Sequence, residues 1–160
     1  MSPAGGQSPA SGEVVRVLYA LAGLRILLGV LWLANLSWKL PPDFGKNDPE
    51  GLLYNFRRAE DYAVIGSLRD LAREVLIPHF TLFGWLVFLA ELTAGVLLLL
   101  GLWTRVGAFI GLVQSMAITL LVVDAPHEWV WTYVMFIAIG IVVLVTPSGS
   151  KLSLDSRRRL

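Results

Sequence analysis

The stretch from Phe80 to Leu102 is the feature that most constrains how this chain can fold. It is almost wholly apolar, and it exceeds the ~20 residues that a helix needs to cross the hydrocarbon core of a bilayer. Glu91 lies in its middle. A carboxylate is costly to leave in lipid, so this one should face the protein interior and have a partner. The sequence therefore predicts a membrane-spanning helix with a buried charge.

The composition agrees with a membrane protein. Hydrophobic residues make up 56% of the 160 residues and charged residues 16%, whereas soluble domains carry about 25% charged residues. The net charge of +1 offers no case for binding nucleic acid. We expect an all-α membrane protein, a four-transmembrane-helix bundle within residues 14–147. Its spans are predicted at about 14–40, 80–102, 106–123 and 129–145.

The polar segments complete the domain plan. Residues 1–13 are small and polar, which predicts a disordered tail. Residues 41–78 connect the first two spans, and an apolar stripe predicts an amphipathic helix there, folded over one end of the bundle. That cap could be simply solvated, or it could be a lid over a ligand site or a docking surface. The stripe comprises Leu68, Leu71, Ala72 and Val75.

The basic residues predict the orientation in the membrane. The turn after the second span contains Arg105, and the basic tail at 148–160 adds Lys151 and three arginines, whereas the turn at 124–128 has no Lys or Arg. Because short cytoplasmic loops are enriched in Lys and Arg, both termini should be cytoplasmic and the 41–78 cap extracytoplasmic. We expect a multi-pass protein of a bacterial or archaeal plasma membrane.

Cysteine and histidine usage limits the redox chemistry. The chain has no Cys, which removes disulfides, Fe–S clusters and thiolate metal sites. Its two histidines, His79 and His127, each precede a span on the same side, which excludes paired axial haem ligands at mid-membrane. We therefore predict no intrinsic haem, Fe–S or metal, although an interfacial site using both histidines stays open. His79 could instead contact a ligand head group.

Arg25 is the predicted partner of Glu91. Counted inward from the expected cytoplasmic ends, the two residues lie roughly 14 and 18 Å deep at 1.5 Å per residue, so adjacent antiparallel helices would bring them together. On a helix, Arg25 shares a face with Gly29, Trp32, Leu36 and Lys39. We predict a buried Glu91–Arg25 ion pair. Lys39 is expected at the far interface, where it could be a snorkelling anchor.

Two roles for the pair are compatible with the sequence. It could only fix helix register, with Gly29 and Gly95 allowing close contact, or it could border a cavity that binds a polar head group or relays protons. Quinone reduction consumes two protons, and a carboxylate beside aromatic rings could supply one. Glu91 and Arg25 are the catalytic candidates. The ligand-binding candidates are Lys39, Trp32, Trp85, Phe88, His79 and Gln114.

The order and spacing of several motifs over roughly residues 17–155 resemble the DoxX/DoxD family. These are Arg25-x-x-x-Gly29 with Lys39, Glu91-x-x-x-Gly95, Leu100-Gly101-Leu102-x-Thr104-Arg105-x-Gly107, and Leu152-Ser153-Leu154-Asp155. The resemblance implies a four-helix membrane protein tied to redox assemblies, and the long connection is more like DoxD, the small subunit of a thiosulfate:quinone oxidoreductase. Arg25, Lys39 and Glu91 correspond to the family's charged positions. Without Cys, the chain cannot handle thiosulfate covalently.

These observations predict a membrane subunit of a quinone-linked oxidoreductase complex in electron transport. It would bind quinone, either menaquinone or ubiquinone, or another small polar ligand beside the buried pair. The alternative is a non-catalytic scaffold or assembly subunit that recruits a larger respiratory enzyme. A small-molecule permease ranks lower, because a four-helix bundle offers little room for alternating access. The expected partners are membrane lipid and other subunits or further copies of the chain.

Overall fold

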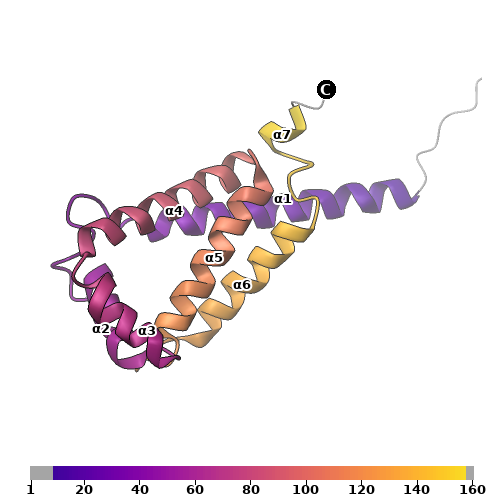
Figure 1. The fold of residues 1–160 in the computed structure, drawn as a ribbon. Coiled ribbons are helices and arrows are strands. Elements are labelled where there is room, and N and C mark those ends of the chain that lie inside the picture. The colour runs from indigo at the N-terminus through magenta and orange to yellow at the C-terminus, as the bar shows by residue number, and fades with distance from the viewer. Residues whose placement is uncertain (1–8, 158–160) are drawn as a thin grey trace, which may run out of the picture.

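The computed structural model describes residues 9–157, and within them all regular secondary structure is helical (Figure 1). The elements are α1 (Pro9–Asn35), α2 (Leu52–Tyr62), α3 (Gly66–Leu71), the π-helical turn η1 (Ala72–Leu76), α4 (Phe80–Leu100), α5 (Thr104–Val122), α6 (Val130–Val145) and α7 (Leu154–Arg157). The expected all-α class is confirmed. The bounds of α4, α5 and α6 lie within two residues of those predicted.

Three helices in the described part of the chain are long and apolar enough to cross a membrane. They are α4, α5 and the Gly12–Asn35 part of α1. The fourth expected span corresponds to α6, which is strongly apolar but has only 16 residues. The α4–α5 turn is tight because Gly101 adopts a left-handed conformation (φ 64°) after the end of α4, a conformation that glycine adopts without steric cost.

The bounds of α1 differ from the expected 14–40 at both ends. Residues 9–13 are helical and not disordered, while 1–8 lie outside the described residues. At the other end α1 stops at Asn35, and tightened turns follow, in which Leu36 N–H donates to Leu33 O and Lys39 N–H to Leu36 O. Pro41 and Pro42 keep the helix from resuming after these turns, because proline disfavours helix in the residue before it and cannot donate a backbone hydrogen bond. Lys39 is therefore not on α1.

The long helices form an arrangement that is closed at one end and open at the other. Figure 1 shows α1 beside α4 and α6 beside α5, with the two pairs converging near the α4–α5 turn and diverging toward α2 and α3. Gly29 of α1 sets the close contact with α4. A Cβ there would lie 2.7 Å from Leu99 N and 3.0 Å from Gly95 O, so only glycine lets these backbones meet.

The 41–78 connection folds as a compact cap of α2, α3 and η1, and not as one amphipathic helix. The predicted stripe is only partly correct, because η1 buries Ala72 and Leu76 while Leu71 is exposed. The π-type bond from Ile77 N–H to Ala72 O (3.0 Å) explains why the buried residues differ from the predicted stripe. An extra residue in a helical turn rotates the side chains that follow it. Phe44, Phe56 and Phe80 pack edge to face beneath the cap.

The cap and the C-terminal segment each satisfy one end of α5. Val64 N–H of the cap donates to Leu120 O (3.1 Å), one of the last carbonyls of α5. At the other end, Thr104 N–H donates to the Asp155 carboxylate (3.4 Å), and Asp155 N–H donates to Gly101 O (3.1 Å). A carboxylate at a helix N-terminus is favourable. The predicted basic tail is thus folded against the bundle through α7, and residues 158–160 lie outside the described part.

Gly29→Ala tests the register of α1 on α4. The added methyl group should force the two backbones apart and lower the free energy of unfolding by about 1–3 kcal/mol. Gly23→Ala is the matched control, because nothing lies within 4 Å of a Cβ there, and it should be neutral or stabilising by up to about 1 kcal/mol. Thermal unfolding in detergent, followed by circular dichroism, measures both. Equal effects of the two variants would contradict this packing.

Candidate functional site

A buried ion pair between Lys39 and Glu91 is the centre of the candidate site. Lys39 Nζ lies 2.5 Å from Glu91 Oε1, and the two residues are 2% and 0% exposed. Glu91 comes from the middle of α4, and Lys39 comes from the turn that follows α1. The Trp38 ring supports the ammonium group, with its centroid 4.3 Å from Nζ. The prediction that Glu91 is buried with a charged partner is confirmed.

The prediction that this partner is Arg25 is wrong. Arg25 donates from Nη1 to Leu98 O (2.5 Å) and from Nη2 to Leu152 O (2.6 Å). The contact of Gly29 with Gly95 and Leu99 explains why Arg25 does not reach Glu91. Arg25 lies one turn before Gly29 on α1, and its side chain therefore reaches the end of α4 at Gly101. The predicted depth of Arg25 is counted from Arg16 as the cytoplasmic end of the first span. In the structure α1 extends past the end of α4, so the two helices do not begin at the same depth (Figure 1).

A cavity of about 800 Å³ opens beside the ion pair, where the helix pairs diverge beneath the cap. Its walls come from α1, α4, α5, α6 and the cap, and most of its lining is apolar. Lys39 and Glu91 line it together with Gln114 of α5. A large apolar cavity with a few convergent polar groups is the usual form of a small-molecule site.

The cavity separates the predicted ligand-binding residues into two groups. Lys39, Trp32 and Gln114 line it, whereas Trp85, Phe88 and His79 do not. Trp85 is exposed and packs edge to face on Phe44 and Phe88. The exposed His79 places Nδ1 3.1 Å from Val75 O. Within residues 9–157, no group of three or more His, Asp or Glu side chains could hold a metal ion.

Two buried polar atoms of cavity-lining residues have no hydrogen-bond partner. They are Oε2 of Glu91, an acceptor when ionised, and Nε1 of Trp32, a donor. Trp32 is only 2% exposed and packs edge to face on Phe136, with 5.3 Å between ring centroids. An unmade hydrogen bond of a buried group costs about 1–3 kcal/mol. The chemistry of this end of the cavity therefore suits a ligand with both donor and acceptor groups.

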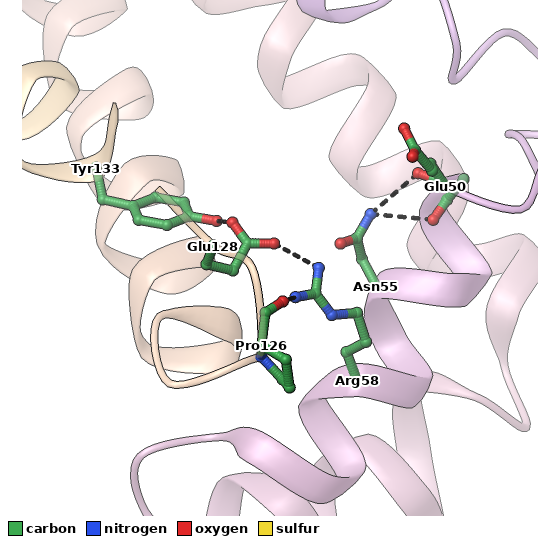
Figure 2. A network of polar contacts seen from close by, with 7 residues as sticks. Glu50, Asn55, Arg58, Pro126, Glu128 and Tyr133 are labelled. Carbon is green, nitrogen blue, oxygen red and sulfur yellow. Dashed lines mark hydrogen bonds and ion pairs between the residues drawn. The ribbon is translucent and has the colours of Figure 1, made fainter. Parts of the chain in front are cut away.

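A second polar group of the cavity was not predicted. Arg58 of α2 forms an ion pair with Glu128, and its Nη2 donates to Pro126 O (2.6 Å) in the α5–α6 loop (Figure 2). The Tyr133 hydroxyl of α6 donates to the other oxygen of Glu128. Glu128 and Tyr133 both line the cavity near the cap. Arg58 and Glu128 are 70 residues apart, and no spacing or periodicity in the sequence connects them.

A family model described as "TQO small subunit DoxD" matches residues 20–158, most of the chain. The chain belongs to the DoxD family. The matched region includes Lys39, Glu91 and every residue that lines the cavity, and the DoxX/DoxD resemblance of the sequence motifs is confirmed. No curated protein and no solved structure matches the chain.

Arg25→Met tests the role that the structure gives Arg25, which is to hold the C-terminal segment. Removing the guanidinium breaks the bonds to Leu98 O and Leu152 O, and hydrogen bonds to charged groups contribute about 1.5–3 kcal/mol. Backbone amides at 149–155 should therefore exchange hydrogen about tenfold faster or more. Hydrogen-exchange mass spectrometry measures this, with Arg16→Met, an exposed position on α1, as the control. Unchanged exchange would contradict the assignment.

Proposed function

We propose that this DoxD protein is the small membrane subunit of a quinone-linked oxidoreductase, and that its cavity holds a quinone head group beside Lys39 and Glu91. The description of its family, a TQO small subunit, supports the first part. The observation that supports the second is the ion pair itself. One carboxylate oxygen of Glu91 is paired with Lys39, and the other is buried without a partner at an apolar cavity.

The size and chemistry of the cavity fit such a ligand. About 800 Å³ lies within the range of small-molecule sites, roughly 300–1,000 Å³, and holds an aromatic ring with part of a hydrocarbon chain. The Trp32 N–H is suited to donate to a ring carbonyl, and Glu91 Oε2 to accept from a ring hydroxyl. When bound, quinone supplies two-electron, two-proton redox chemistry.

The protein side chains have separate roles in this proposal. Glu91 accepts or returns a proton at Oε2, the oxygen that Lys39 leaves free. Lys39 balances the charge of the carboxylate and holds its orientation. Ser115 already donates to Gly111 O (2.8 Å), so its hydroxyl proton is committed to α5. Gln114 also lines the cavity beside the Glu91 carboxylate, and its amide can donate to that carboxylate or to the ligand.

We propose that α6 is the fourth span. Its 16 residues extend about 24 Å at 1.5 Å per residue, somewhat less than the ~30 Å hydrocarbon core. Tryptophans mark both ends of the bundle. Trp129 and Trp131 at the start of α6 are 65% and 63% exposed, and Trp103 in the α4–α5 turn is 63% exposed. Such aromatic belts are typical of the two membrane interfaces, and modest thinning accommodates a short span.

The same proposal places both termini in the cytoplasm and the cap outside. The start of α1 and the C-terminal segment lie at the end of the bundle that holds the α4–α5 turn, opposite α2 and α3 (Figure 1). Arg105 and Lys151 belong to that end, and the 124–128 turn at the other end has no Lys or Arg. Partner subunits of the complex would then meet the cap on the extracytoplasmic face.

Replacing the ion pair tests quinone binding. Glu91→Gln alone would leave the Lys39 ammonium buried and unpaired, which typically costs 3–5 kcal/mol and could unfold the protein. The double variant Lys39→Met/Glu91→Leu instead removes both charges, a change that is often neutral or stabilising. We expect it to fold with a melting temperature near that of the wild type, but to co-purify with about tenfold less quinone, measured by mass spectrometry of extracted lipid.

Glu60→Gln is the control for this experiment. It removes one carboxylate of an ion pair, that of Glu60 with Arg73 Nε at 2.8 Å, in the cap and outside the cavity lining. Its quinone content should equal that of the wild type. A double variant with full quinone content would reduce the Lys39–Glu91 pair to a structural role. A wild type with no quinone would contradict the proposal and favour the scaffold function.

Single cysteines test the orientation, and the chain has no native Cys that would interfere. Tyr54→Cys lies on the exposed face of α2, and Ser150→Cys lies in the exposed part of the C-terminal segment. A membrane-impermeant maleimide added to intact cells should label the first and not the second. After the cells are lysed, both should react. Labelling of Ser150→Cys alone in intact cells would reverse the proposed orientation.

A further inference from the structure

The exposed part of the cavity lining is entirely apolar. The lining residues with exposed side chains are Ala34, Leu71, Ala117 and Leu120, which we call the rim. The polar lining residues lie deeper. Lys39, Glu91 and Ser115 are buried, and the others are half-buried, namely Asn35, Asn55, Gln114, Glu128, Thr132 and Tyr133. The cavity thus has a polar interior behind a hydrophobic rim.

Three of the four rim residues lie on helices that could span a membrane, and the fourth belongs to the cap. Ala34 is in the last turn of α1, and Ala117 and Leu120 are on α5, both helices that are long and apolar enough to cross a bilayer. Leu71 of α3 completes the rim where the cap reaches α5, close to the bond from Val64 N–H to Leu120 O. An exposed apolar opening on such helices is suited to contact with hydrocarbon.

Polar contacts join the cap to the α5–α6 loop on another side of the cavity. Arg58 of the cap holds both the Glu128 carboxylate and Pro126 O of the α5–α6 loop (Figure 2). The Tyr133 hydroxyl, bonded to the same carboxylate, extends this bridge to α6. A ligand passing between the cap and the α5–α6 loop would have to separate this charged, hydrogen-bonded contact, whereas the four rim side chains are apolar.

We propose that the cavity is loaded laterally from the bilayer by a membrane-resident amphiphile. Its hydrogen-bonding ring enters first and reaches Glu91 and Trp32, and its prenyl chain remains across the rim, in contact with Ala34 on one side and Ala117 on the other. The identity of the ring as a quinone rests on the proposed function. The entry route, and the need for a hydrocarbon chain on the ligand, are inferred from the apolar rim.

Phenylalanine at the rim tests this route. Ala34→Phe and Ala117→Phe fill the rim without touching the ion pair, and Ala138→Phe is the control, because Ala138 is exposed on α6 but does not line the cavity. The probes are decylubiquinone and the same benzoquinone ring without its chain. Binding to full-length protein in nanodiscs is followed by quenching of tryptophan fluorescence, and circular dichroism checks that each variant is folded.

Lateral loading predicts a chain-specific effect. Both rim variants should weaken decylubiquinone binding about tenfold, the loss expected when about two methylene groups are no longer buried. They should leave binding of the chainless ring within about twofold, as the control should for both probes. Unchanged decylubiquinone binding in the rim variants, or equal weakening of both probes, would overturn lateral loading while leaving the proposed function intact. If neither probe binds the wild type, both proposals fail.

Arg58→Ala separates the two routes kinetically. It removes the bridge from the cap to Glu128 and Pro126, and Arg58 is not one of the rim residues. Lateral loading predicts that the association rate of decylubiquinone stays within about twofold of the wild-type rate, since a tenfold change corresponds to 1.4 kcal/mol in the barrier. A several-fold faster association in this variant would show that the ligand enters through the cap, and would overturn the proposal.

Discussion

The ion pair between Lys39 and Glu91 is the constraint on which the rest of the bundle depends. Two charges buried between membrane-spanning helices are tolerated only when they are paired, because each alone would cost several kcal/mol. To reach Glu91, the chain must leave α1 at Asn35 and turn before Pro41. The segment that follows then packs along the first half of α4, where Phe44 lies against Gly84. The position of Lys39 is thus linked both to the end of α1 and to the packing of the following segment on α4.

The two ends of the bundle use charge differently. At the closed end, Arg25 satisfies the carbonyls of Leu98 and Leu152 and so joins α1, α4 and the C-terminal segment. At the open end, Lys39 and Glu91 leave one carboxylate oxygen free at a cavity, and Arg58 with Glu128 links the cap to the α5–α6 loop. An arginine that donates to carbonyls of two segments is suited to hold structure, whereas a carboxylate with a free oxygen beside a cavity is suited to bind a ligand.

The cavity follows from the uneven contacts of the helices. Gly29 lets α1 and α4 touch at the backbone, and Gly107 lets α5 approach Ala94 and Leu98 of α4. Both contacts lie near the closed end. Toward the cap the helix pairs diverge, and larger side chains such as Trp32, Trp38 and Phe136 line the space between them. The small residues therefore determine where the helices touch, and the aromatic residues determine how much volume remains for a ligand.

The sequence by itself determined the class of the protein, the helices, the burial of Glu91 and the DoxD family. Each of these depends on composition, on the length of apolar runs or on motifs local in the chain. Only the tertiary structure decided that Glu91 pairs with Lys39 and not Arg25, because helix offset depends on the contact of Gly29 with Gly95 and Leu99, which helix lengths and periodicity do not encode. The same holds for the contact between Arg58 and Glu128, since residues 70 positions apart meet only when the cap folds over the bundle.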